Sequence, residues 1–286
     1  MEQHNDDQPV GRILSRREVL ALLGGSSVAV IAGLSLPRLA SAQSATPTAA
    51  ALPACVVRPE LTEGPYFVDD QLKRMDIRID PTDASIKAGL PLLLIYKVSD
   101  VTSGVCAPLT NAQIDVWHCD ADGVYSGVQD AGFDTSGQLW LRGYQITDED
   151  GVAKFLTIVP GWYSGRAVHI HFKIRVDTGE AEAYEFTSQF FFDPELIETI
   201  YAEEPYAAQG SPDTPNSEDN IYQGSEGLML LDLMPLTEEE LAELEVEAGY
   251  SATFDIGLDL SDASVGASDS AGGGGGPGGG RPGGRP

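Results

Sequence analysis

The segment from Val159 to Arg175, VPGWYSGRAVHIHFKIR, places the strongest constraint on how this chain can fold. His169 and His171 stand one residue apart in an apolar run of β-favouring residues. Side chains alternate between the two faces of a strand, so both imidazoles are expected on the same face. Tyr163 lies six residues before His169, in a Pro-Gly turn. The pattern predicts a strand that carries a metal site.

Strand signals recur along the chain and indicate its fold class. Apolar or alternating runs of β-favouring residues cover Leu90–Val98, Ala112–Trp117, Val152–Val159, Tyr184–Phe192 and Tyr250–Leu260. Many short strands with few helices predict a mainly β chain, namely a β-sandwich with a few short helices and long loops.

Two helix starts stand between the strands. Asp193 followed by Pro194 is typical of an N-cap with proline at the first helical position. Thr237 and Glu240 form a capping-box pattern, and that helix is expected to continue to Gly249. The polar, proline-containing segment 203–222 is predicted to be a long ordered loop.

The N-terminus has the features of an export leader. Arg16 and Arg17 precede a moderately apolar segment, Val19–Leu36, and small residues follow at Ala40–Ala42. This order resembles a twin-arginine-type signal peptide over residues 1–42, which predicts a periplasmic, extracellular or cell-surface protein. A retained membrane anchor is the alternative, because the apolar run is about long enough to span a bilayer.

The predicted organisation continues beyond the leader. Residues 43–54 are rich in Ala, Thr and Pro and are predicted to be a linker. One domain is expected over 55–260. The Gly/Pro-rich segment 261–286 cannot bury a core and is predicted to be a disordered tail.

Charge and cysteine spacing argue against several function classes. The chain has 44 acidic and 17 basic residues and a net charge of -27. This argues against nucleic acid or an anionic membrane surface as a partner, since phosphate contacts need Lys and Arg. Cys55, Cys106 and Cys119 form no Cys-x-x-Cys pair, so a thiolate zinc site is not indicated. A Cys55–Cys106 disulfide and three buried free thiols are both compatible with the sequence.

The choice of metal depends on nearby tyrosines. Imidazoles alone suit zinc, copper, iron or nickel. A phenol, with an ordinary pKa of about 10, gives up its proton only to a strong Lewis acid, which favours Fe(III). The candidate phenolates are Tyr163 and Tyr125, the second on a loop after a strand that ends in a tryptophan. Arg166, three residues before His169, is a candidate for holding an anion near the metal.

Three segments together resemble a known enzyme family. They are Glu63–Phe67 (EGPYF), Ile114–Tyr125 (IDVWHCDADGVY) and Pro160–Phe172 (PGWYSGRAVHIHF). They are similar to the intradiol ring-cleaving dioxygenases, which comprise the catechol, hydroxyquinol and protocatechuate dioxygenases. The resemblance spans roughly residues 55–260, the whole predicted domain. It implies a non-haem Fe(III) enzyme that cleaves a catechol-type substrate with O2 to a cis,cis-muconate-type product.

The resemblance also implies roles for single residues. Its four iron ligands match Tyr125, Tyr163, His169 and His171. Tyr163 matches the tyrosine that leaves the iron when substrate arrives and then acts as a base. Arg166 and Gln189 match residues that lie near the substrate. A long helical N-terminal segment, which pairs subunits in the catechol and hydroxyquinol enzymes, is not evident here, so a homo-oligomer is left open.

Two other interpretations compete with this one. Residues 108–117 and 147–163 also resemble small β-sandwich modules of the carboxypeptidase-regulatory and adhesin type, which would make the chain a non-catalytic binding module. A Cu/Zn superoxide dismutase would need more histidines than His118, His169 and His171 supply. His118 and Cys119 are expected in the core. Core packing and pocket lining are both open for Tyr66, Phe67, Trp140 and Trp162.

Overall fold

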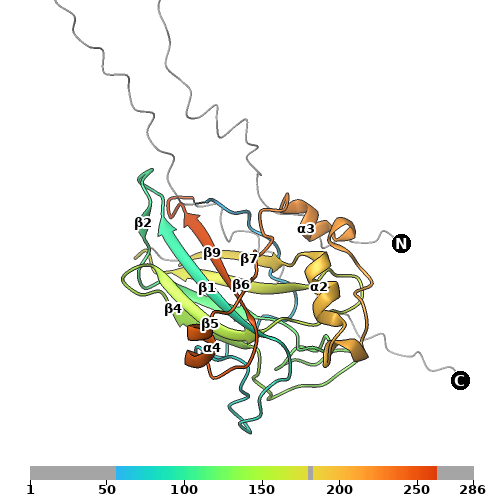
Figure 1. Ribbon diagram of the computed structural model, residues 1–286. Coiled ribbons are helices and arrows are strands. Elements are labelled where there is room, and N and C mark those ends of the chain that lie inside the picture. The colour runs from blue at the N-terminus through green and yellow to red at the C-terminus, as the bar shows by residue number, and fades with distance from the viewer. Residues whose placement is uncertain (1–55, 180–182, 263–286) are drawn as a thin grey trace, which may run out of the picture. The chain divides into compact units, whose positions relative to one another are not determined.

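Figure 1 shows the computed structural model of the chain, which describes residues 56–179 and 183–262. The predicted signal peptide (1–42) and linker (43–54) lie outside the described residues, as does the predicted tail beyond Asp262. Within the described ranges, no helix is long and apolar enough to cross a membrane.

The first of two sheets is organised around β1 (Pro91–Asp100). β1 pairs in parallel with β9 (Tyr250–Leu258) and antiparallel with β5 (Val152–Ile158). The short strands β2 (Ala107–Pro108) and β8 (Met234–Pro235) pair with β1 and β9. Leu92, Leu93 and Leu94 are all buried, so this part of β1 is covered on both faces, as the continuous apolar run predicts.

The second sheet has four antiparallel strands in the order β4-β3-β6-β7. They are β4 (Arg142–Ile146), β3 (Gln113–Trp117), β6 (His169–Val176) and β7 (Tyr184–Phe191). Figure 1 shows β6 and β7 running side by side. The predicted mainly β architecture, a sandwich of two sheets, is confirmed.

An aromatic cluster around Tyr96 joins the two sheets. Tyr96 on β1 is fully buried. Its ring lies 5.6 Å from those of Phe172 on β6 and Phe190 on β7. Phe155 and Phe254, from the first sheet, lie 5.8 and 6.2 Å from the same ring. Each such ring contributes roughly 1.5–3 kcal/mol by leaving water, so this cluster is a large part of the force that holds the sheets together.

Strand β6 presents a different chemistry on each face. Ile170, Phe172 and Ile174 belong to the hydrophobic core between the sheets. His169 and His171 alternate with them and are also buried, at 2% and 1% exposure. The strand therefore has the core on one face and a buried polar site on the other.

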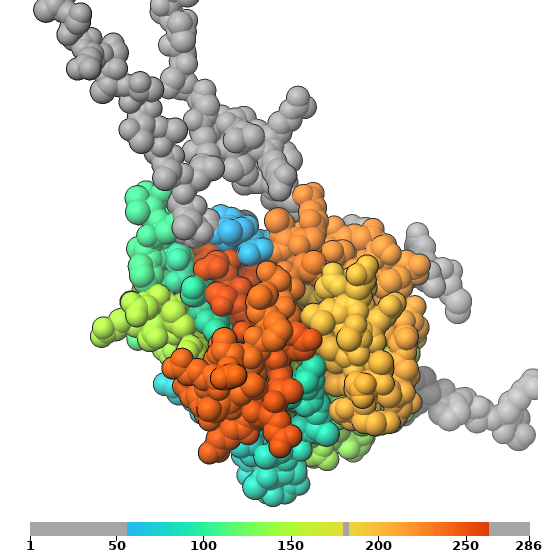
Figure 2. Space-filling model, viewed as in Figure 1, coloured from blue at the N-terminus to red at the C-terminus, as the bar shows by residue number. Residues whose placement is uncertain are grey.

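Short helices cover part of the sandwich. α2 (Pro194–Tyr201) begins at the predicted cap, where the Asp193 side chain accepts from the backbone N–H groups of Glu195 and Leu196. The segment 203–222 is ordered but not wholly a loop, because it contains 3-10 turns at Tyr206–Ala208 and Asn216–Glu218 and the start of α3 (Asn220–Gly224). In Figure 2 the chain from α2 to β9, yellow to red, forms most of the visible described surface.

The predicted length of the last helix is wrong. The capping box of Thr237 and Glu240 is present, but α4 spans only Glu238–Glu243. None of its residues is buried, so little packing energy supports a longer helix. Glu239, Glu243 and Glu247 would also repel one another at four-residue spacing. Glu245 then adopts a positive φ of 52°, which ends the helical path.

The cysteines divide into two kinds. Cys106 is disulfide-bonded, whereas Cys119 is a buried free thiol, so the alternative of three free thiols is wrong. The other member of the predicted pair, Cys55, lies outside the described residues.

His118 is a hydrogen-bonded core histidine, as predicted. Its Nδ1–H donates to the Cys119 carbonyl oxygen over 2.7 Å, and its Nε2 accepts from the Thr157 hydroxyl over 2.6 Å. His118 follows β3 and Thr157 lies on β5, so this contact connects the two sheets. Burial lowers the pKa of His118 to about 4. The imidazole is therefore neutral at physiological pH.

The metal-free protein is expected to lose stability as the pH falls from 6.5 to about 4. In that window His118 binds a proton in the unfolded chain but not in the folded one, so the free energy of unfolding rises with pH. The full shift corresponds to roughly 3 kcal/mol. His118→Asn should flatten the dependence of unfolding free energy on pH, measured by urea denaturation at a series of pH values. An unchanged slope in the variant would show that His118 is not buried as a neutral ring.

Candidate metal centre

The two histidines of β6 bring their Nε2 atoms together. These atoms lie 3.1 Å apart, and the ring planes cross at 80°. In the sheet, His171 stands directly opposite Trp117 of β3 and Gln189 of β7. The Trp117 ring stacks on the His171 ring at 5.1 Å and 9°. The neighbouring strands thus fix the position of His171 from both sides.

The two predicted tyrosines reach the same point from separate loops. Tyr163 lies between β5 and β6, and its Oη is 3.0 Å from His169 Nε2. Tyr125 follows β3, and its Oη is 3.4 Å from the same nitrogen. Two phenol oxygens and two imidazole nitrogens therefore gather around one position. The structure brings together all four residues that the sequence singled out as ligands.

A close backbone contact holds the two tyrosine loops together. The N–H of Gly161 donates to the Asp120 carbonyl oxygen over 2.9 Å. A Cβ atom at Gly161 would lie only 2.3 Å from the carbonyl oxygen of Ala121. Only glycine allows this approach, which brings Tyr163 towards Tyr125.

Hydrogen bonding fixes the tautomer of His169. Its Nδ1 lies 2.6 Å from the carbonyl oxygen of Ala167, which can only accept, so Nδ1 carries the proton. The Nε2 atom then has a free lone pair that faces the other three side chains. This is the arrangement of a metal-binding imidazole whose second nitrogen is held by the backbone.

Burial keeps these four groups neutral. It lowers the pKa values of His169 and His171 well below the ordinary value. It raises the pKa of Tyr163 to about 12 and that of Tyr125 well above its ordinary value. At neutral pH both imidazoles therefore offer lone pairs, and both phenols keep their protons until a strong Lewis acid displaces them.

The donor set fits a single metal ion. Ligand atoms about 2 Å from a common ion lie roughly 3 Å apart, which agrees with the 3.0–3.4 Å contacts around His169 Nε2. Among the described residues, no group of three or more His, Cys, Asp or Glu side chains could hold a metal. The oxygens of Tyr125 and Tyr163 are thus needed to complete the set, and hard phenolate oxygens suit a trivalent ion.

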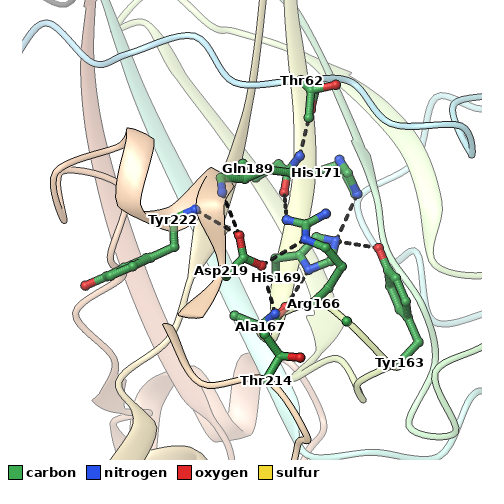
Figure 3. Close-up of polar contacts among 12 residues, drawn as sticks. Thr62, Tyr163, Arg166, Ala167, His169, His171, Gln189, Thr214, Asp219 and Tyr222 are labelled. Atoms are coloured by element: carbon green, nitrogen blue, oxygen red, sulfur yellow. Dashed lines mark hydrogen bonds and ion pairs between the residues drawn. The ribbon is translucent and has the colours of Figure 1, made fainter. Parts of the chain in front are cut away.

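Arg166 and Gln189 lie beside this cluster (Figure 3). Arg166 Nη2 donates to Gln189 Oε1 over 2.6 Å, and Gln189 Nε2 donates to the Thr62 carbonyl oxygen over 2.7 Å. Arg166 Nε also pairs with Asp219 over 2.8 Å. A cationic guanidinium is therefore held in a fixed orientation next to the four donor atoms.

Sequence reasoning missed some supporting residues. Thr62 and Asp219 received no role, although both contact the polar network of Figure 3. Asp219 directly precedes a helix, so an N-cap pattern was the available signal. For Tyr66 the sequence does not distinguish core packing from lining of the pocket. Its ring stacks on Tyr125 at 4.4 Å, which places it over a candidate ligand.

The other three aromatic residues for which core packing and pocket lining were both open pack in different parts of the protein. Phe67 packs against Trp117 at 4.8 Å between ring centroids. Trp140 is buried in a small separate cluster with Leu141 and Ile158, which favours core packing. Trp162 packs partly buried on the main core, and its indole N–H donates to the Gly210 carbonyl oxygen.

Comparisons with known proteins agree with this geometry. The family model described as Dioxygenase matches residues 62–202. Chlorocatechol 1,2-dioxygenase of Cupriavidus pinatubonensis is 33% identical over 147 residues, which cover 46% of this chain and 53% of the relative. Catechol 1,2-dioxygenase of Acinetobacter baylyi is 29% identical over 145 residues, or 42% of each protein. The matched part thus spans about half the length of these relatives or less.

A solved structure covers more of the chain. The intradiol ring-cleavage dioxygenase of Tetranychus urticae has 25% sequence identity and a TM-score of 0.57, and the match covers 72% of this chain and 94% of that one. The chain belongs to the intradiol ring-cleavage dioxygenase family. This membership favours the dioxygenase interpretation over both the binding module and the superoxide dismutase.

Gly64→Ala is expected to weaken metal binding about tenfold relative to Gly104→Ala. The two glycines have φ values of 74° and 76°, so alanine costs a similar strain of about 1 kcal/mol at each. A Cβ at Gly64 would lie 3.1 Å from Cε1 of His171, whereas at Gly104 it would meet nothing within 4 Å. Chelator competition measures the affinity, and thermal unfolding controls for strain. Equal affinities in the two variants would count against His171 as a ligand.

Proposed function

We propose that this protein is a non-haem Fe(III) intradiol dioxygenase that opens catechol-type rings between the two hydroxylated carbons. Tyr125, Tyr163, His169 and His171 would hold the iron. The observation that carries the proposal is that two phenol oxygens and the Nε2 atom of His171 all lie 3.0–3.4 Å from His169 Nε2. The match of this chain to the Dioxygenase family model supports the same proposal.

Bound Fe(III) would supply a Lewis acid that favours the deprotonated catechol and allows its ring to react with O2. The ring carbon–carbon bond breaks, and both oxygen atoms enter the cis,cis-muconate-type product. The reaction therefore requires no external reductant. Catechol and O2 are its two partners.

The two tyrosines differ in a way that supports different roles. Tyr125 is 1% exposed and lies beneath the ring of Tyr66. Tyr163 is only partly buried and precedes the exposed residues Ser164 and Gly165. Tyr163 is thus the freer of the two to move aside. We assign Tyr163 as the ligand that would leave the iron, and its phenolate Oη would then accept a proton from the incoming catechol.

Arg166 and Gln189 would act on the substrate side of the site. The guanidinium of Arg166 would place a positive charge beside a catechol bound at the four donors, and would stabilise the negative charge that develops on its ring. Gln189 holds the guanidinium through its Oε1 atom. Neither residue needs to bind the metal for this role.

The cellular location is also a proposal. The twin-arginine-type leader over residues 1–42 supports export to the periplasm, the exterior or the cell surface. Export in the folded state would allow the iron to be inserted in the cytoplasm. A homo-oligomer stays a prediction.

Iron-loaded protein is expected to consume one O2 for each catechol oxidised. Oxygen uptake should be measured over a panel of catechol, chlorocatechols, hydroxyquinol and protocatechuate, with the product spectrum recorded. Labelled O2 should place both atoms in a muconate-type product. Uptake with none of the panel would overturn the enzyme assignment, and a semialdehyde product would overturn intradiol cleavage.

His169→Ala should abolish both oxygen uptake and the red-brown colour that tyrosinate–Fe(III) charge transfer gives. His118→Asn is the matched control, because it also removes a buried imidazole but lies outside the four donors. The absorption spectrum and iron content of the two variants provide the measurement. A His169→Ala protein that keeps both its colour and its iron would contradict the assignment of His169 as a ligand.

A further inference from the structure

The carboxylate of Asp219 is buried next to the site, and both of its oxygens accept hydrogen bonds. The residue lies between the 3-10 turn Asn216–Glu218 and α3, and its side chain is 1% exposed. Oδ1 accepts from the backbone N–H groups of Ile221 and Tyr222 over 2.8 and 3.0 Å. Oδ2 faces the opposite way, towards β6. One carboxylate thus connects α3 to the residues just before β6, the strand that carries both histidines.

The contacts of Oδ2 reach the site by two short routes. Oδ2 accepts from Arg166 Nε over 2.8 Å and from the backbone N–H of Ala167 over 2.9 Å (Figure 3). Arg166 in turn donates to Gln189. Ala167 offers its carbonyl oxygen to the Nδ1–H of His169. Asp219 therefore contacts the guanidinium directly and is linked to a candidate ligand, His169, through Ala167 alone.

Capping of α3 alone does not account for this carboxylate. α3 has five residues, whereas the longer α2 is capped in the same manner by Asp193, whose side chain lies at the exposed surface. Asp193 Oδ1 accepts from Glu195 and Leu196 in the way that Asp219 Oδ1 accepts from Ile221 and Tyr222. The cap function thus needs only one oxygen and no burial. The second oxygen of Asp219 is committed to Arg166 and Ala167.

We propose that Asp219 is a positioning residue that holds Arg166 in its working orientation before substrate binds; this rests on the proposed dioxygenase function. The guanidinium donates hydrogen bonds to two partners, from Nε to Asp219 and from Nη2 to Gln189. A charge-assisted hydrogen bond to a buried carboxylate restricts the guanidinium more strongly than a neutral one. Asp219 itself touches neither the metal ligands nor the substrate position. It acts through Arg166.

The first test is the kinetics of Asp219→Asn in iron-loaded protein. The amide keeps an oxygen for the α3 cap, but its NH2 group cannot accept from Arg166 Nε–H or Ala167 N–H. We expect kcat for catechol to fall roughly 10- to 100-fold, with the iron colour retained. Asp193→Asn makes the same chemical change at the α2 cap and should alter kcat by less than about twofold. Equal effects of the two variants would overturn the proposal.

A double-mutant cycle separates positioning from general destabilisation. In an Arg166→Gln background, Asp219→Asn should have almost no further effect on kcat, because the group that it positions is already gone. Additive losses would overturn the proposal, since they would show that Asp219 acts independently of Arg166. Thermal unfolding of all four proteins checks that each remains folded.

A readout that does not depend on turnover keeps the two proposals distinguishable. In protein loaded with diamagnetic Ga(III) in place of Fe(III), the Nε–H proton of Arg166 should exchange slowly with solvent, observed by NMR. Asp219→Asn should make it exchange fast, whereas Asp193→Asn should not. Unchanged exchange in Asp219→Asn would overturn the positioning role even if the enzyme is active. If no catechol is turned over, the dioxygenase function fails and the exchange result still decides the role of Asp219.

Discussion

The side-chain alternation of β6 is the constraint on which the rest of the structure depends. Ile170 and Phe172 enter the core between the sheets, while His169 and His171 face the site. Because the two sets share one backbone, the packing that fixes Phe172 also fixes the imidazoles. A slip of one residue would send both histidines into the aromatic core and expel the apolar side chains. The stability of the sandwich and the precision of the site therefore have the same origin.

Because the site is buried, the charges of its side chains must be neutralised or paired. Burial penalises net charge, and the four donors are neutral in the absence of a cation. A trivalent ion held by Tyr125 and Tyr163 would displace their phenol protons, so much of its charge would be offset within the site itself. The charge of Arg166 is likewise offset by Asp219, which is buried beside it. Polar groups are thus concentrated here without leaving a large uncompensated charge.

Patterns of short range could be predicted from the sequence. The strand period placed His169 and His171 on one face, and the Asp193–Pro194 pair marked the start of α2. Contacts between distant segments could not be derived in this way. Asp219 lies 53 residues from Arg166, and no local pattern announces their pairing. The early end of α4 was missed because the capping box signals where a helix starts, whereas its length depends on packing against the rest of the protein.

The turn between β5 and β6 is fastened at both ends. Gly161 is bonded to Asp120 near its start, and Ala167 is bonded to Asp219 near its end. Tyr163 and Arg166 lie between these two points, so the turn has almost no freedom to lengthen without displacing one of them. The segment 203–218 is hydrogen-bonded to the same turn, because the Trp162 indole N–H donates to the Gly210 carbonyl oxygen and the Gly165 N–H donates to Asp213 Oδ1. An insertion in that segment would therefore also shift Tyr163 and Arg166, although it contacts neither the four donor atoms nor the substrate.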